Sequence, residues 1–79
     1  MNRRQCRMAR AALDWTQHDL AAAAGVSWRT VARFEGGESV LPARVQKMRA
    51  ALEERQVVFI DGGRMAGGLV PPKDEPVSR

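Results

Sequence analysis

Residues that form disulfides, bind metals or catalyse reactions are scarce in this chain of 79 residues. It has one cysteine, Cys6, and one histidine, His18, so no intrachain disulfide can form and no zinc ligand set can be assembled. A single cysteine also favours a reducing compartment. No nucleophile–base set or pair of acids stands out in the sequence. We therefore expect no catalytic residue, no metal, no cofactor and no enzyme activity.

The chain also lacks a long apolar segment. No run approaches the roughly 20 residues that cross a bilayer, and no apolar block follows the basic start MNRRQCRMAR, so it is not a secretion signal. The segment GGRMAGGL lacks a phosphate loop's Lys-Ser/Thr pair, because Gly68 and Leu69 stand in its place. These absences predict a cytoplasmic protein without a membrane partner or nucleotide chemistry.

The charge that is present is mostly positive. Thirteen Lys and Arg residues against nine Asp and Glu residues give a net charge of +4. The excess lies mostly in the first 34 residues, where six arginines face only Asp14 and Asp19. A clustered basic excess favours a polyanionic partner such as nucleic acid, although solubility alone would also account for it.

Apolar periodicity and capping residues predict four helices. Thr16 with Asp19 forms a capping-box pattern, Ser27 is a second N-cap, and Gly25 is suited to end a helix. Pro42 fits the first turn of the last helix. The expected helices are Arg3–Asp14, Gln17–Ala24, Trp28–Glu35 and Pro42–Arg55.

The C-terminal part has a different pattern. The β-branched and aromatic run Val57–Ile60 predicts a strand, and Leu69-Val70 can return as its partner. The Pro-rich, charged segment 71–79 predicts a disordered tail. We therefore divide the chain into a domain of residues 1–56, a strand or hairpin element of 57–70, and the tail. The strand pairs either within one subunit, against the fourth helix, or across a two-fold axis, where it would be a dimerisation element.

The second and third helices are joined by a short turn centred on Gly25. Such a pair fixes two helices at a steep angle and exposes the second for docking in the major groove of DNA. Leu20, Val31 and Phe34 are expected to bury against the other helices, and Ala21 is small enough for a close helix crossing.

The segment TQHDLAAAAGVSWRTVARFEGG resembles the helix-turn-helix of the phage-repressor-like (Xre-type) transcriptional regulators. The similarity rests on Thr16-Gln17, Leu20-Ala21, Gly25-Val26-Ser27, Val31 and Glu35-Gly36-Gly37. It extends over roughly residues 3–52 and implies a compact all-α, four- to five-helix repressor-like DNA-binding domain. The chain departs from the family after the fourth helix, where a short C-terminal β-strand or hairpin is expected instead of a fifth helix.

The resemblance also implies roles for individual residues. Gln17 would bond a phosphate and brace the recognition helix, residues 28–35, in the major groove. Arg29 and Arg33 lie four residues apart, hence on one helix face, and would read guanine. Thr30 would face outward to a phosphate. The implied DNA-binding residues are Gln17, Ser27, Trp28, Arg29, Thr30, Arg33, Gly37 and Arg44.

The resemblance also implies a structural role for one pair of residues and DNA contacts for three further residues. Arg10 and Glu35 match a buried ion pair of some family members. Gly37 would leave backbone N–H groups open to phosphate, and Arg44 would reach the flanking backbone. Trp28 departs from the usual polar residue and would contact thymine methyls or sugar, or else cover an apolar patch or a dimer contact.

The expected function is that of a sequence-specific double-stranded DNA-binding transcriptional regulator, associated with the nucleoid when bound. It would act as a homodimer on a palindromic site with half-sites roughly 10 base pairs apart or a multiple of this. The alternative is an antitoxin-type protein whose segment 57–79 binds a protein partner while the helix-turn-helix autoregulates. A third possibility is a helix-turn-helix used only for protein contacts.

Overall fold

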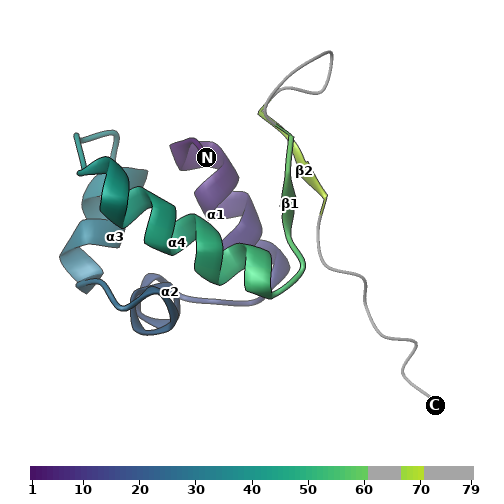
Figure 1. Cartoon of the computed structure of the whole chain (residues 1–79), viewed down its shortest axis with the longest axis horizontal. Helices are drawn as coiled ribbons and strands as arrows, with labels where there is room; N and C mark the ends of the chain where they lie inside the picture. The colour runs from purple at the N-terminus through teal and green to yellow at the C-terminus, as the bar shows by residue number, and fades with distance from the viewer. Residues whose placement is uncertain (61–66, 71–79) are drawn as a thin grey trace.

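Four helices followed by a two-stranded hairpin form the computed structural model, which describes residues 1–60 and 67–70 (Figure 1). The elements are α1 (Arg3–Ala12), α2 (Gln17–Ala24), α3 (Trp28–Glu35), α4 (Pro42–Glu54), β1 (Val58–Phe59) and β2 (Leu69–Val70). The predicted all-α fold with a C-terminal hairpin is confirmed. The predicted tail, residues 71–79, lies outside the described residues.

Helices α1 and α4 end slightly earlier than the sequence predicted. The predicted helix Arg3–Asp14 stops at Ala12, because Asp14 adopts a left-handed conformation with φ of 56°. The predicted end of α4 at Arg55 is one residue too late, and Gln56 has φ of 68°. A left-handed residue stops helix propagation, and it is uncommon for a residue with a side chain.

The capping residues around the turn behave as predicted. The Thr16 hydroxyl accepts from the Asp19 N–H at 3.1 Å, and the Asp19 carboxylate accepts from the Thr16 N–H at 2.9 Å. Gly25 ends α2 with φ of 70°, a conformation that glycine adopts without steric cost. Ser27 caps α3 by accepting from the Thr30 N–H at 3.2 Å. These local bonds set where α2 stops and α3 starts.

The core lies where the four helices meet. Helices α1 and α4 lie above α2 in Figure 1, and α3 closes one end of the molecule. Leu20 and Val31 are fully buried, as predicted, and Phe34 packs at the edge of the core. The other buried apolar side chains are Cys6, Ala9, Ala21, Met48, Ala51, Leu52, Val57 and Phe59. In the described part of the chain no helix is both long and apolar enough to cross a membrane.

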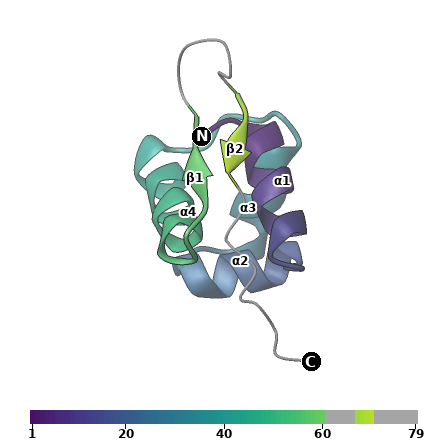
Figure 2. The same cartoon turned by 90° about the vertical axis from the view of Figure 1, so that its right-hand side faces the viewer.

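The hairpin lies between α1 and α4, at the end of the molecule opposite α3 (Figures 1 and 2). Its strands are antiparallel, with Val58 opposite Val70 and Phe59 opposite Leu69. Phe59 is buried, whereas Val58 and Val70 are 55% and 49% exposed. Because cross-strand partners share a face, one face of the hairpin covers the core and the other presents two valines to solvent.

A buried glutamine that the sequence analysis did not single out attaches the hairpin to α1. The Gln5 side-chain amide donates to the Gly68 carbonyl at 2.7 Å and to the Ile60 carbonyl at 3.3 Å. Its oxygen accepts from the Asn2 N–H at 2.9 Å, and the Asn2 side chain in turn caps α1. The hairpin is therefore held by long-range hydrogen bonds as well as by burial of Phe59.

Candidate nucleic-acid interface

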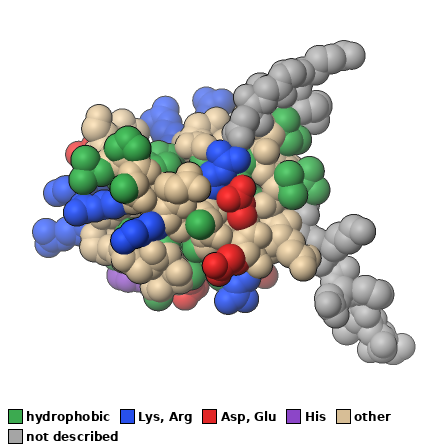
Figure 3. Space-filling model, in the orientation of Figure 1, with side chains coloured by type: hydrophobic (Ala, Val, Ile, Leu, Met, Phe, Trp, Pro, Cys, Tyr) green, Lys and Arg blue, Asp and Glu red, His purple; other side chains and the backbone are tan. Residues whose placement is uncertain are grey.

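Helix α3 divides its side chains between the interior and the surface. Val31 and Glu35 are buried, four residues apart, and point into the molecule. Arg29 and Arg33, also four apart, are exposed on the other side of the helix. Several Lys and Arg side chains gather at the end of the molecule that carries α3, at the left of Figure 3. The helix therefore has a cationic outer face and a buried inner face that carries Val31 and Glu35.

The guanidinium groups of Arg29 and Arg33 are available for a partner. Within residues 1–60 and 67–70, neither forms a hydrogen bond or an ion pair. A guanidinium can donate two parallel hydrogen bonds to an acceptor pair such as guanine O6 and N7. Two such groups on one face of an exposed helix are suited to reading base edges in a groove.

A buried ion pair fixes the inner face of α3 to α1. Arg10 donates through Nε to Glu35 Oε2 at 2.6 Å and through Nη2 to Glu35 Oε1 at 2.7 Å. Its third nitrogen, Nη1, donates to the Trp15 carbonyl at 2.9 Å. Only 3% of the Glu35 side chain is exposed. This is the pair that the resemblance implied, and its bidentate geometry sets the orientation of α3 relative to α1.

Two further donors complete the hydrogen bonding of Glu35. The Cys6 thiol lies 3.1 Å from Oε2, and the Gln17 amide lies 3.1 Å from Oε1. Burial alone would raise the pKa of Glu35, but hydrogen bonds from Arg10, Cys6 and Gln17 lower it below its usual value. Burial raises the pKa of the Cys6 thiol, so Cys6 stays protonated and acts as a donor. Cys6 is thus a hydrogen-bond donor as well as a buried core residue.

Gln17 connects α2 to both ends of α3. Its amide nitrogen donates to Glu35, the last residue of α3, and its oxygen accepts from the indole N–H of Trp28, the first, at 3.2 Å. The bracing role expected for Gln17 thus has a specific geometry. A side-chain amide has two N–H donors, so one remains for a phosphate.

Trp28 is turned back onto the start of α2. Its ring stacks on His18 with ring centres 5.2 Å apart and planes within 3° of parallel, and its indole N–H bonds Gln17. The residue is still 44% exposed. Trp28 is therefore a partly exposed ring held against the start of α2, and His18 supports it by stacking.

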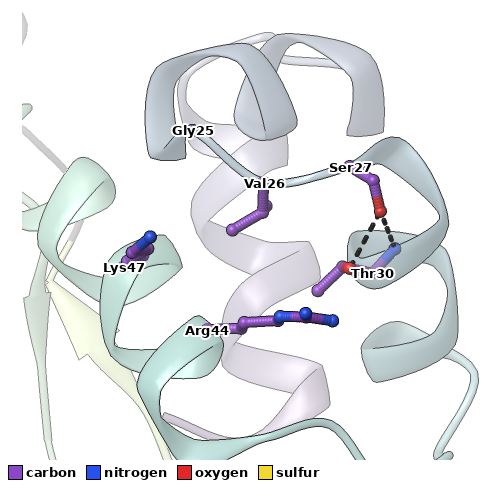
Figure 4. A pocket seen from close by; sticks show the side chains of 6 residues that line it. All are labelled: Gly25, Val26, Ser27, Thr30, Arg44 and Lys47. Carbon is purple, nitrogen blue, oxygen red and sulfur yellow. Dashed lines mark hydrogen bonds between the residues drawn. The ribbon is translucent and has the colours of Figure 1, made fainter.

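Thr30 is mostly buried, which corrects the expectation that its side chain faces outward. It is only 7% exposed, and its hydroxyl lies 2.9 Å from the Ser27 hydroxyl (Figure 4). The reason is local: residues three apart at a helix start face each other, so the capping serine and Thr30 bond together. Thr30 supports the cap, and Ser27 remains at the surface.

A hollow opens beside this cap. It has a volume of about 290 Å³ and lies between the α2–α3 turn and α4. Arg44 extends across it toward Thr30, and Lys47 lines it one turn further along α4 (Figure 4). Two cations next to hydroxyl groups suit a phosphate oxygen. Lys47 was not among the predicted residues, because its position in the hollow depends on how α4 crosses α2.

Gly37 also differs from its expected role. Its N–H donates to the Phe34 carbonyl at 3.1 Å, and the Glu38 N–H donates to the Arg33 carbonyl at 2.9 Å. Both bonds close the C-terminal end of α3, with Gly37 in the left-handed conformation at φ of 89°. The N–H groups expected to bind phosphate are therefore used within the protein.

Two short helices are joined by a glycine-centred turn, and the second carries on its outer face two arginines that have no partner in the described part of the chain; together these features define a helix-turn-helix DNA-binding domain. A helix-turn-helix family model matches residues 7–55, and the chain belongs to this family, that of the phage-repressor-like (Xre/Cro/CI-type) regulators. The protein is a DNA-binding helix-turn-helix regulator of transcription. No match was found among curated proteins.

Proposed function

We propose that this regulator binds double-stranded DNA sequence-specifically, as a homodimer on a palindromic site, with α3 in the major groove. The observation that carries the proposal is the outer face of α3, where Arg29 and Arg33 have no partner among the described residues. The bidentate Arg10–Glu35 pair and the Gln17 bridge brace this helix from behind. A rigid helix with free arginines is what base recognition requires.

The surrounding residues supply contacts that position the protein rather than read sequence. The free amide N–H of Gln17 and the start of α2 are suited to one phosphate. Ser27 and Arg44, together with Lys47, are suited to a second phosphate at the hollow. The fixed edge of Trp28 is suited to a sugar or a thymine methyl. Such contacts make affinity fall steeply with salt.

Selection of bound sites from random DNA tests this proposal. We expect enrichment of a palindrome rich in guanine at the positions facing Arg29 and Arg33, with half-sites roughly 10 base pairs apart or a multiple of this. The measurement is sequencing of the retained DNA after several rounds at moderate salt. Retention of DNA without any common sequence would contradict sequence-specific recognition.

The hairpin favours a second candidate function, binding of a protein partner as in antitoxin-type regulators. Val58 and Val70 are exposed cross-strand partners on the hairpin, and the hairpin lies at the end of the molecule opposite α3 (Figures 1 and 2). Two copies packed face to face through these valines would carry their α3 helices at opposite ends of the dimer. That arrangement does not place both helices on one side of a duplex, so the hairpin face is better suited to a partner other than the operator-bound copy.

The double substitution V58S/V70S tests whether the hairpin valines hold the operator-bound dimer or are left for a different protein partner. We expect DNA affinity to change by no more than about twofold, because exposed positions away from α3 contribute little to folding or DNA contact. The stoichiometry of two chains per palindromic site is expected to persist, measured by sedimentation of the protein–DNA complex. A loss of the second chain would show instead that the valine face holds the operator-bound dimer. Deleting residues 57–79 is a poorer test, since it removes the buried Val57 and Phe59.

A further inference from the structure

An arginine from α1 lies against the end of the recognition helix. The Arg3 Nη1 atom is 2.6 Å from the position that a Cβ on Gly37 would occupy, and Cζ is 3.6 Å from it. The guanidinium thus lies over bare backbone that only glycine leaves open. A side chain at position 37 would be strained in the left-handed turn and would displace the Arg3 guanidinium.

The loop that follows α3 has no cation of its own. The residues between α3 and α4, GGESVL, include Glu38 and no Lys or Arg. The N–H groups of Gly37 and Glu38 are used to close α3. Arg3 supplies the missing positive charge, and within the described residues its guanidinium forms no hydrogen bond or ion pair. The negative end of the α3 dipole favours a cation at this place.

With Arg3 included, cationic side chains lie at both ends of α3. Arg44 and Lys47 line the hollow at its N-terminal end, and Arg3 lies at its C-terminal end. An eight-residue helix is about 12 Å long, which is comparable to the width of the major groove, about 12 Å. Cations at the two ends of such a helix are therefore spaced to meet phosphates that border one groove.

We propose that Arg3 contacts a DNA backbone phosphate beyond the C-terminal end of α3, which makes the start of α1 part of the DNA interface. The inference rests on the proposed function and adds to it a contact outside the helix-turn-helix. Arg3 positions the protein and does not read bases, because it lies beyond the face that carries Arg29 and Arg33.

Salt titration of DNA binding by R3A, with R4A as a matched control, tests the contact. Arg4 is the next residue of α1, is equally charged and exposed, and has no described contact with the α3–α4 loop. For R3A we expect the slope of log affinity against log salt to fall by about 0.9. Affinity should fall by the same factor on the selected site and on unrelated DNA, and the circular dichroism melting curve should be unchanged. For R4A we expect less than half of this change in slope.

The contact would be overturned if the slope of log affinity against log salt for R3A equalled that of the unmodified chain or that of R4A. The proposed function would then remain intact. Absence of DNA binding by the unmodified chain would overturn both. The variant G37A gives a second readout, because its methyl group displaces Arg3. In the G37A background, R3A is expected to cause no further loss of affinity. A full additional loss in a folded G37A chain would contradict the proposed position of Arg3.

Discussion

Replacing Arg29 and Arg33 together with alanine is expected to weaken binding to the selected site by roughly 30- to 20,000-fold. Each good bidentate arginine–guanine pair contributes about 1–3 kcal/mol of discrimination, and about 1.4 kcal/mol corresponds to a tenfold change in affinity. Both side chains are exposed and have no described partner, so the fold should be retained. The measurement is fluorescence anisotropy on the selected duplex and on an unrelated duplex of equal length.

The control for this experiment removes two arginines from another exposed helix surface. R4A/R7A lowers the net charge by the same amount but leaves the outer face of α3 unchanged. It should weaken binding to both duplexes similarly and preserve the ratio between them. R29A/R33A should lower that ratio strongly. If both double variants preserved the ratio, α3 would not be the element that reads the bases.

Replacing Glu35 with glutamine is expected to destabilise the fold by about 3–5 kcal/mol. Glutamine keeps the shape, but it leaves the partly buried Arg10 guanidinium without its counter-charge and gives Cys6 and Gln17 a weaker acceptor. Small domains have only about 5–15 kcal/mol of unfolding free energy, so this loss is a large share. The free energy of unfolding can be measured by urea denaturation followed by circular dichroism.

The exposed ion pair between Arg49 and Glu53 provides a matched comparison on α4. Its Nε–Oε2 distance is 3.2 Å, but 42% of the Glu53 side chain is exposed. E53Q should cost no more than about 0.5 kcal/mol, as is typical of i,i+4 surface pairs. Equal losses in E35Q and E53Q would show that the Arg10–Glu35 pair does not stabilise the fold more than a surface pair does.

The lowered pKa of Glu35 sets the direction of the pH dependence. Because the folded state lowers this pKa, the stabilisation is complete above the unfolded value of about 4.3 and is lost as pH falls through the folded value. The unmodified chain should therefore lose stability in acid more steeply than E35Q. Parallel profiles for the two proteins would exclude Glu35 as the source of this dependence.

The same carboxylate connects stability to recognition. Glu35 accepts from Gln17, and Gln17 accepts from Trp28, so a bonded path runs from the buried ion pair to the edge of the proposed DNA-binding surface. Loss of the Glu35 charge therefore weakens the support of α3 as well as the core. Trp28, stacked on His18, belongs to this support and to the surface at once.

Much of the fold follows from short-range patterns. Thr16 with Asp19, Gly25 and Ser27 locate the turn from the sequence, because each acts on backbone groups within four residues. The Arg10–Glu35 pair could be inferred only through the family resemblance, since the two residues are 25 positions apart. The ends of α1 and α4 were predicted at Asp14 and Arg55, a little late, because left-handed residues other than glycine, here Asp14 and Gln56, have weak sequence signals.

The sequence by itself therefore determined four helices, a glycine-centred turn and an outer α3 face that carries Arg29 and Arg33. Periodicity and capping are local properties of a chain, so they can be read without its fold. Only the tertiary structure decided that Thr30 turns inward, that Arg3 covers Gly37, and that the hairpin lies at the end of the molecule opposite α3. These placements depend on how separate elements cross and on which backbone groups are already bonded. The packing of all the elements together determines how the elements cross and which backbone groups are bonded.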